Sequence, residues 1–284
     1  MADASTLDVL QAAVAALQSG QRAALLTVVR TIGSAPRHSG AKMLVQADGS
    51  LVGTIGGGTV EERAVADAVQ ALSDGGSVLK TYNISGQGDD NLGLCGGAAD
   101  VSIEVLAPAP RLVIIGAGHI GQALATLADI VGIDVDVFDD RPDWATAERF
   151  PTAKGLHIVA YDRHTEALAP LPVQIAASTA VVVATWGWDA PALRQILPTP
   201  AFYIGLVGSR RKLKLMAELL TAGGFDRQQI ERIHAPAGLD LGGEAPGEIA
   251  LSIMAEIQTV RYSASAQPLV SVRRPASASP SART

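Results

Sequence analysis

A glycine motif of the G-x-G-x-x-G type offers the clearest chemistry in this sequence. Gly116, Gly118 and Gly121 come directly after the apolar run 112–115 and directly before a helical pattern. In such a unit the first glycine allows a tight turn, the second lets the backbone approach a phosphate, and the third lets the helix pack against the strand. The helix N-terminus favours an anion. We therefore expect these glycines, with His119 between them, to bind a phosphate-bearing cofactor; a glycine turn of purely structural use is the alternative.

An acidic residue stands where this motif commonly has a ribose contact. Asp139 lies 18 residues past Gly121, at the end of the next expected strand. A carboxylate there can accept hydrogen bonds from a ribose hydroxyl. Asp140 is the competing candidate, and the structural alternative is that both acids solvate a strand end or pair with Arg141.

A serine and several cations lie at another strand-to-helix junction. Ser209 can cap the helix that follows, and Arg210 and Arg211 come directly after it. The backbone N–H groups there, together with one of these arginines, suit a bidentate phosphate contact. A charged helix face in solvent explains the same cations equally well, so both interpretations stay open.

The N-terminal half contains a second glycine-rich region. Arg37 lies among small residues, and Gly56, Gly57 and Gly58 form a glycine turn at the start of an expected helix. Together these residues could cradle an anionic ligand. The alternative is that the glycines only close turns.

The sequence has a single cysteine, Cys95, which is followed by Gly96 and Gly97. One cysteine excludes a disulfide within the chain. A thiolate among glycines could serve as a soft metal ligand or as a sulfur carrier. On the residues alone, a buried small apolar side chain is the favoured alternative.

A polar, glycine-rich segment precedes the last expected helix. His234, Asp240 and Glu248 lie in or next to it and could act as acid-base or ligand-positioning groups. Glu248 in the first turn of a helix is equally explained by the helix dipole.

The first half of the chain has the pattern of a small α/β domain. Ser5 can cap a helix over 6–18, whose expected packing stripe is Leu7, Leu10, Val14 and Leu17. A capping box of Thr59 and Glu62 is expected to open a helix that runs to about residue 72. The expected strands are 24–29, a hairpin of 43–45 with 51–55, then 78–83 and 101–106.

The second half alternates strands and helices, which predicts a Rossmann-type doubly wound parallel sheet. A proline-rich connector at 107–110 separates an N-terminal α/β domain, 1–106, from this domain, 111–262, and the Ser-, Ala- and Pro-rich residues 263–284 are expected to be disordered. The expected strands are 111–115, 134–138, 157–160, 181–185 and 203–207, with helices from about 120, at 191–196, over 210–222 and from Pro246.

Composition excludes several classes of protein. The net charge of −6 over 284 residues provides no chain-wide positive field for nucleic acid or an anionic membrane. The first residues lack the basic region of a signal peptide, and no run of about 18 apolar residues occurs. We therefore expect a soluble, cytoplasmic protein that binds its anionic ligand locally.

Seven segments, taken in order, resemble the xanthine dehydrogenase accessory family (XdhC/CoxI). They are 33–37, 53–58 with Glu61, 94–97, 116–121, 139–141, 203–212, and 233–240 with 248–250. Segments 185–189 and 242–246 depart from the family pattern, since the family often carries histidine near the first of them.

The resemblance implies an insertion chaperone and not a turnover enzyme. Members of this family bind molybdenum cofactor (molybdopterin), in some cases protect its sulfurated form, and deliver it to xanthine dehydrogenase-type molybdenum hydroxylases. The expected ligand contacts are then the residues above, with Cys95 at the metal. A cysteine desulfurase is a candidate second partner, and a homodimer is the expected assembly. The competing function is an NAD(P)- or flavin-dependent oxidoreductase, because the same glycine motif binds dinucleotides.

Overall fold

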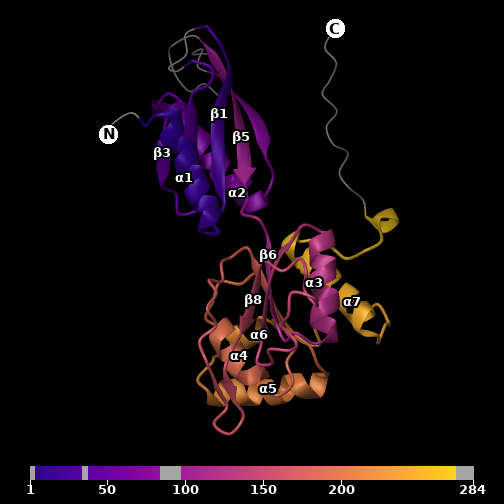
Figure 1. The fold of residues 1–284 in the computed structure, drawn as a ribbon. Helices are drawn as coiled ribbons and strands as arrows, with labels where there is room; N and C mark the ends of the chain where they lie inside the picture. Colours follow the sequence, from indigo (N-terminus) through magenta and orange to yellow (C-terminus); the bar gives the residue numbers. More distant parts are fainter. Residues whose placement is uncertain (1–3, 34–37, 84–96, 273–284) are drawn as a thin grey trace. The chain divides into compact units, whose positions relative to one another are not determined.

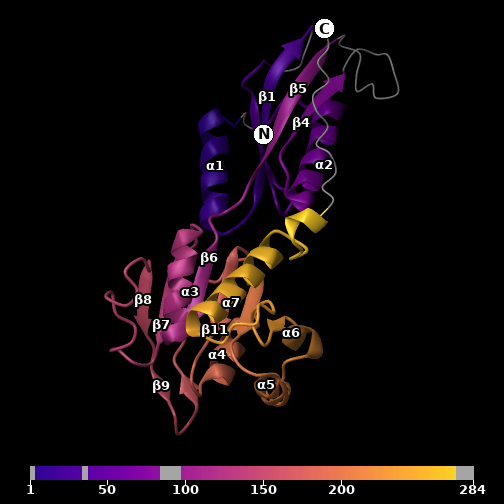
Figure 2. The same ribbon diagram turned by 90° about the vertical axis from the view of Figure 1, so that its right-hand side faces the viewer.

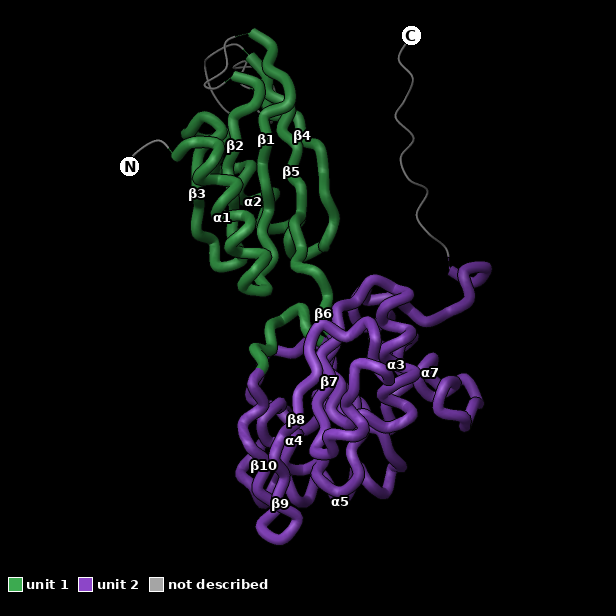
Figure 3. Tube along the Cα trace, viewed as in Figure 1, with its two compact units in different colours: residues 1–111, 173–179 green, residues 112–172, 180–284 purple. Residues whose placement is uncertain are grey.

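The computed structural model describes residues 4–33, 38–83 and 97–272. The chain divides into two compact units, which Figure 3 colours separately. Unit 1 comprises residues 1–111 and 173–179, and unit 2 comprises 112–172 and 180–284. The segment 173–179, expected in the second domain, thus groups with the first.

Unit 1 is an antiparallel sheet with a helix on each face (Figure 2). Its sheet order is β3-β2-β1-β5-β4. Side chains alternate along β1, so that Ala23 faces α1 while Ala24 and Leu26 face α2. The elements are α1 (Thr6–Gln18), β1 (Ala23–Ile32), β2 (Lys42–Gln46), β3 (Leu51–Gly53), α2 (Gly58–Asp74), β4 (Val78–Asn83) and β5 (Ala98–Leu106).

The expected packing stripe of α1 is wrong. Leu7 is 63% exposed, and Leu10 and Val14 are exposed with it, whereas Val9, Ala13 and Ala16 form the buried face. The helix has apolar residues on two sides, and the smaller ones allow it to approach the sheet closely. At Gly53 this approach leaves no room for a side chain, because a Cβ atom there would overlap Val9 and the backbone of Lys42. The distance between α1 and the sheet, and not hydrophobicity alone, therefore determines which face of the helix is buried.

The start of α2 also differs from the expected capping box. Gly57 is the N-cap residue and provides no side-chain cap. Instead, the carboxylate of Glu61 accepts hydrogen bonds from the N–H of Ile55 at 3.0 Å, the N–H of Gly57 at 3.2 Å and the hydroxyl of Thr54. A side chain of the helix itself therefore fills the place where the glycine turn would hold an anion.

Unit 2, drawn in Figure 1 with β6 and β8 labelled, has the predicted Rossmann-type sheet. Its strand order is β13-β12-β11-β6-β7-β8. The pairs β7–β8, β11–β12 and β12–β13 are parallel. In chain order this arrangement is 3-2-1-4-5-6, which is the doubly wound topology. Its strands are β6 (Arg111–Ile115), β7 (Asp134–Asp139), β8 (Gly155–Ile158), β11 (Thr179–Val183), β12 (Tyr203–Leu206) and β13 (Ile233–His234).

Helices α3 (His119–Ile130) and α7 (Pro246–Arg261) lie side by side and share one core with the sheet. Leu112 and Ile114 of β6 face this core, and Ile253 and Ile257 of α7 complete it. The remaining helices are α4 (Asp189–Ile196), α5 (Arg210–Ala222) and α6 (Arg227–Glu231).

Four short elements were not expected from the sequence: the two-residue strands β9 (Tyr161–Asp162), β10 (Ala167–Leu168) and β13, and helix α6. Of the segment expected to be disordered, residues 263–272 are described and include a short 3-10 helix at Leu269–Ser271; the remainder lies outside the described residues. In the described ranges, no helix has both the length and the apolar character needed to cross a membrane.

We expect Glu61→Ala to destabilise unit 1 by about 1–3 kcal/mol, because it leaves two backbone N–H groups and a hydroxyl without their acceptor. Glu62→Ala is the matched control, since it makes the same charge change at the same helix end on an exposed residue. Hydrogen exchange of the peptides covering 54–64 measures the effect. Equal exchange in the two variants would contradict the role given to Glu61.

Candidate phosphate-binding site

A pocket of about 320 Å³ opens at the carboxyl edge of the unit 2 sheet. It lies at the end of β6 and β11, where the order of strands along the sheet reverses. Ligands of doubly wound proteins bind at this switch point. The pocket is lined by Gly118, His119, Ile120, Gly121, Ala184, Thr185, Val207 and Pro246.

The three motif glycines have different roles. Gly116 has φ +118°, and a Cβ atom there would overlap the carbonyl of Ala184. A Cβ atom on Gly121 would overlap the carbonyl of Gly116. Gly118 has an ordinary φ of −67°, and a Cβ atom there would meet nothing within 4 Å. Gly116 and Gly121 therefore allow the loop to pack, while Gly118 keeps the pocket open.

The N-terminus of α3 has no side-chain cap. Its N-cap residue is Gly118, whereas Ser5 caps α1 and the Ser209 hydroxyl accepts from the N–H of Lys212 at 3.3 Å to cap α5. The first N–H groups of a helix have no partner within the helix. At α3 these groups adjoin the pocket, so that the site is suited to a phosphate or another anion.

Asp139 holds the glycine loop in place. Its side chain is 1% exposed and accepts four hydrogen bonds: from the N–H of Ala117 at 2.6 Å, and from Arg141 through its N–H at 2.9 Å, Nε at 2.8 Å and Nη2 at 3.0 Å. Burial raises the pKa of this carboxyl, but the hydrogen bonds from Arg141 and Ala117 outweigh burial and hold it below its ordinary value.

Four hydrogen bonds fill the lone-pair positions of a carboxylate. Direct contact between Asp139 and a ribose would therefore require Arg141 to move away. Asp140, the competing candidate, lies 3.5 Å from Arg163 and 3.9 Å from Arg141. The structure thus gives Asp139 a positioning role toward the loop.

A second arginine contacts the loop from its carbonyl side. Arg149 Nη2 donates to the carbonyl of Ala117 at 3.2 Å. The ring of Trp144 lies between the guanidinium groups of Arg141 and Arg149, at 4.2 and 4.4 Å, and meets His119 edge-on at 5.6 Å. The Ala117 backbone is therefore held through both its N–H and its carbonyl, and no sequence signal singles out Arg149 or Trp144 for this role.

The turn after β12 is held by an ion pair that the sequence did not single out. Lys212 Nζ donates to Asp189 at 2.8 Å and to the carbonyl of Val207 at 3.0 Å. The predicted cap by Ser209 is confirmed. Arg210 and Arg211 are exposed at the start of α5, two strands from β6, and their phosphate contact stays a prediction.

His234 belongs to a hydrogen-bonded network centred on Glu256 of α7. The Glu256 carboxylate receives the Tyr203 hydroxyl at 2.6 Å, the Gly238 N–H at 2.7 Å and His234 Nδ1 at 2.9 Å. Burial raises the pKa of Glu256, but the hydrogen bonds from His234, Tyr203 and Gly238 hold it below its ordinary value. The sequence analysis missed this network. The signal that could have indicated it is Glu256 itself, an acid between Ile253 and Ile257 in the apolar stripe of α7.

Asp240, Gly56, Gly57 and Gly58 are not among the residues that line the unit 2 pocket. Asp240 is exposed in the loop after β13. Gly56, Gly57 and Gly58 lie in unit 1, where Glu61 accepts from Gly57 and the Thr54 hydroxyl accepts from the N–H of Gly56. Arg37 and Cys95 lie outside the described residues.

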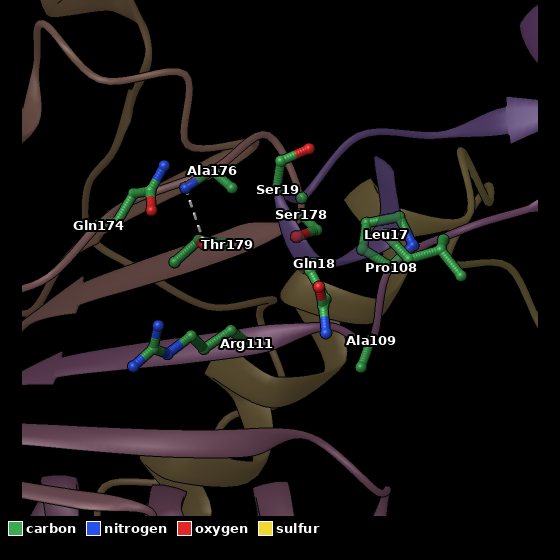
Figure 4. Close-up of a pocket in the computed structure, with 11 residues that line it drawn as sticks. Leu17, Gln18, Ser19, Pro108, Ala109, Arg111, Gln174, Ala176, Ser178 and Thr179 are labelled. Carbon is green, nitrogen blue, oxygen red and sulfur yellow. Dashed lines mark hydrogen bonds between the residues drawn. The ribbon is translucent and has the colours of Figure 1, made fainter. Parts of the chain in front are cut away.

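Unit 1 has a pocket of its own, of about 170 Å³ (Figure 4). Its polar lining includes Ser19, Gln174, Ser178 and Arg111, and the N–H of Ala176 donates to the Thr179 hydroxyl at 3.2 Å. The lining residues include no carboxylate and no thiol. This composition provides neither a nucleophile of the cysteine type nor an acid-base pair.

The doubly wound sheet and its glycine loop define a Rossmann-type protein with a candidate anion site at the switch point. Residues 112–257 match the model of the XdhC Rossmann domain, and residues 16–83 match that of the XdhC and CoxI family. The chain belongs to the XdhC and CoxI family.

Three relatives show how far the similarity extends. YqeB of Escherichia coli K12, an uncharacterized protein, is 40% identical over 85% of this chain, but the chain spans only 44% of that relative's length. The molybdenum cofactor insertion chaperone PaoD of the same organism is 28% identical, over 89% of this chain and 88% of PaoD. A Bacillus subtilis 168 protein that is named as a probable xanthine dehydrogenase subunit is 27% identical over 87% of this chain and 96% of its own length.

The Glu256 network predicts a pH-dependent stability. Because the folded-state pKa lies below the ordinary value of 4.5, Glu256 stabilises unit 2 fully above about pH 4.5, and this contribution is lost as the pH falls through the folded-state pKa. We expect Glu256→Gln to cost about 2 kcal/mol at pH 7 and progressively less below pH 4.5.

The measurement is the urea midpoint of wild type and Glu256→Gln from pH 7 to pH 3. Glu218→Gln, on an exposed residue of α5, is the control for the loss of one negative charge. A difference between wild type and Glu256→Gln that stays constant over this pH range would contradict the assignment.

Proposed function

We propose that this protein binds molybdenum cofactor in the unit 2 pocket and delivers it to a xanthine dehydrogenase-type molybdenum hydroxylase. The observation that carries the proposal is the N-terminus of α3, which has no side-chain cap and adjoins a pocket of about 320 Å³ lined in part by Gly118. The cofactor is the cargo of this protein, and its phosphate is the group that α3 would hold.

The pocket is suited to holding a ligand and not to transforming it. Of its eight lining residues, His119 is the only one with a titratable side chain, and the others offer backbone, apolar surface or the Thr185 hydroxyl. A general acid or base has to lie within hydrogen-bond reach of a reacting atom. His119 is the one lining side chain that could take this role, and the other seven lining residues can only hold a ligand, so we favour a carrier over an enzyme.

The relatives support the same function. PaoD matches this chain over most of both lengths and is named for insertion of molybdenum cofactor. The Bacillus subtilis relative is named as part of a probable xanthine dehydrogenase. These names are consistent with a client of the xanthine dehydrogenase type.

As part of the proposal, Cys95 meets the metal–sulfur end of the cargo, and a cysteine desulfurase supplies the sulfur where the sulfurated form is carried.

An NAD(P)-dependent oxidoreductase is less well supported by the site. Recognition of the adenosine ribose in Rossmann-type proteins depends on an acid after the second strand. Here the carboxylate of Asp139 is occupied by Ala117 and Arg141. A nicotinamide cofactor would therefore find the Asp139 carboxylate already bonded within the protein.

The test is to produce the protein in cells that make molybdenum cofactor, purify it anaerobically, and assay bound molybdenum, pterin and nicotinamide in one sample. We expect molybdenum and pterin in equal amounts and no nicotinamide. Adding the loaded protein to an apo-hydroxylase should raise its activity while the molybdenum leaves the chaperone. NADH bound with turnover, and no molybdenum, would contradict the proposal.

Gly118→Val tests the placement of the phosphate. We expect this variant to fold normally, because φ is ordinary and the added Cβ meets nothing, but to carry at least about ten-fold less molybdenum, because its side chain enters the pocket. Gly76→Val is the matched control, since a Cβ atom there also meets nothing within 4 Å and the residue lies in unit 1. Normal molybdenum content in Gly118→Val would show that the phosphate lies elsewhere.

A further inference from the structure

The loop after β11 begins in the lining of the unit 2 pocket, at Ala184 and Thr185, and then presents a tryptophan to solvent. Trp186 is 90% exposed, whereas Trp188, two residues further on, is 2% exposed. The loop is anchored around Trp186: the ring of Trp188 stacks on Tyr161 at 6.0 Å, and the Tyr161 hydroxyl donates to the carbonyl of Gly187 at 3.1 Å. Trp186 is thus an exposed aromatic side chain on a loop fixed at its far end.

The same loop borders the glycine motif on its near side. Ala184 and Thr185 line the pocket, and β11, which precedes them, is the neighbour of β6 in the sheet (Figure 2). The contact is close, because a Cβ atom on Gly116 would overlap the carbonyl of Ala184 and lie 3.1 Å from the nitrogen of Thr185. Trp186 therefore follows a segment that packs directly on the phosphate-binding loop.

Thr185 adds a polar group to the pocket lining. Its Oγ1 atom is buried and makes no hydrogen bond with the described part of the chain. A buried hydroxyl without a partner is uncommon in a folded protein and often marks the place of a ligand or a water. Thr185 also lines the pocket, so a ligand with donors and acceptors at its edge can satisfy the hydroxyl after a rotation of the side chain.

The pocket lining contains a single aromatic ring, that of His119. This ring meets Trp144 at about a right angle, with the ring centroids 5.6 Å apart. A flat heterocycle gains most from a partner that can stack on its face. Trp186 is an exposed aromatic residue that directly follows the lining residue Thr185 along the chain.

We propose that Trp186 stacks on the flat pterin ring of the cargo while the Thr185 hydroxyl bonds its polar edge. This inference rests on the proposed function and assigns the pterin end of the cargo to the β11 side of the pocket, with the phosphate at α3. The ligand class that fits is a planar heterocycle with hydrogen-bonding edges and a phosphate attached to it.

The test compares Trp186→Ala, Trp186→Phe and Ile130→Ala with wild type. Ile130 is 73% exposed at the far end of α3 and controls for the loss of an exposed apolar side chain. Each protein is titrated anaerobically with molybdenum cofactor released from a purified hydroxylase, and intrinsic tryptophan fluorescence is recorded. We expect Trp186→Ala to bind about ten- to a hundred-fold more weakly, Trp186→Phe to retain most of the affinity, and Ile130→Ala to match wild type.

In wild type, emission from the exposed indole should be quenched on binding, and the quench should be smaller in Trp186→Ala, which retains Trp144 and Trp188. Wild-type affinity in Trp186→Ala would overturn the inference, and so would equal losses in the alanine and phenylalanine variants. Normal binding by Trp186→Ala with failed activation of the hydroxylase would place Trp186 against the client and also overturn it. A wild-type protein that binds no cofactor would instead refute the proposed function.

Discussion

The buried Asp139 carboxylate determines the geometry on which the unit 2 site depends. A charge that is 1% exposed is tolerated only when hydrogen bonds replace its water, and here the Ala117 N–H and three groups of Arg141 do so. Arg141 stacks on Trp144, Trp144 stacks on Arg149, and Arg149 returns to the carbonyl of Ala117. These contacts form a closed circuit that begins at the N–H of Ala117 and ends at its carbonyl. The backbone fixed in this way leads into the first turn of α3, whose residues line the pocket.

The chain contains two glycine turns at helix N-termini, and the structure separates their roles. At α2 the carboxylate of Glu61 accepts from the backbone of the turn, so an anion of the protein already occupies that position. At α3 no side chain of the described residues caps the helix. Each turn contains three glycines in the sequence. The two turns differ in the residue four positions after the N-cap glycine, which is the acid Glu61 after Gly57 and the neutral Gln122 after Gly118. A carrier that has to release its cargo is served by backbone amides, which bind a phosphate without a buried opposite charge.

Much of the fold could be predicted from the sequence, because its local signals agree with the tertiary structure. The strand at Arg111–Ile115 and the helix at Arg210–Ala222 have the predicted bounds, since apolar runs and the Ser209 cap define them locally. The buried face of α1 was not predictable, because Leu7 and Leu10 are as apolar as Val9, and helix-to-sheet distance decided between them. The position of Asp139 was predicted, but its partners Arg149 and Trp144 lie beyond the motif and depend on tertiary contacts. Glu256 was missed because an acid in an apolar stripe acquires meaning only when Tyr203, His234 and Gly238 surround it.

The central claim is that the open helix end of α3 holds the phosphate of the cargo. A crystal structure of the protein purified with molybdenum cofactor tests this claim most directly. The account predicts that the phosphate oxygens accept hydrogen bonds from the backbone N–H groups at the start of α3, while Asp139 keeps its bonds to Ala117 and Arg141. A phosphate bound at the Gly56–Gly58 turn, or a carboxylate of Asp139 released from Arg141 to contact the ligand, would contradict it.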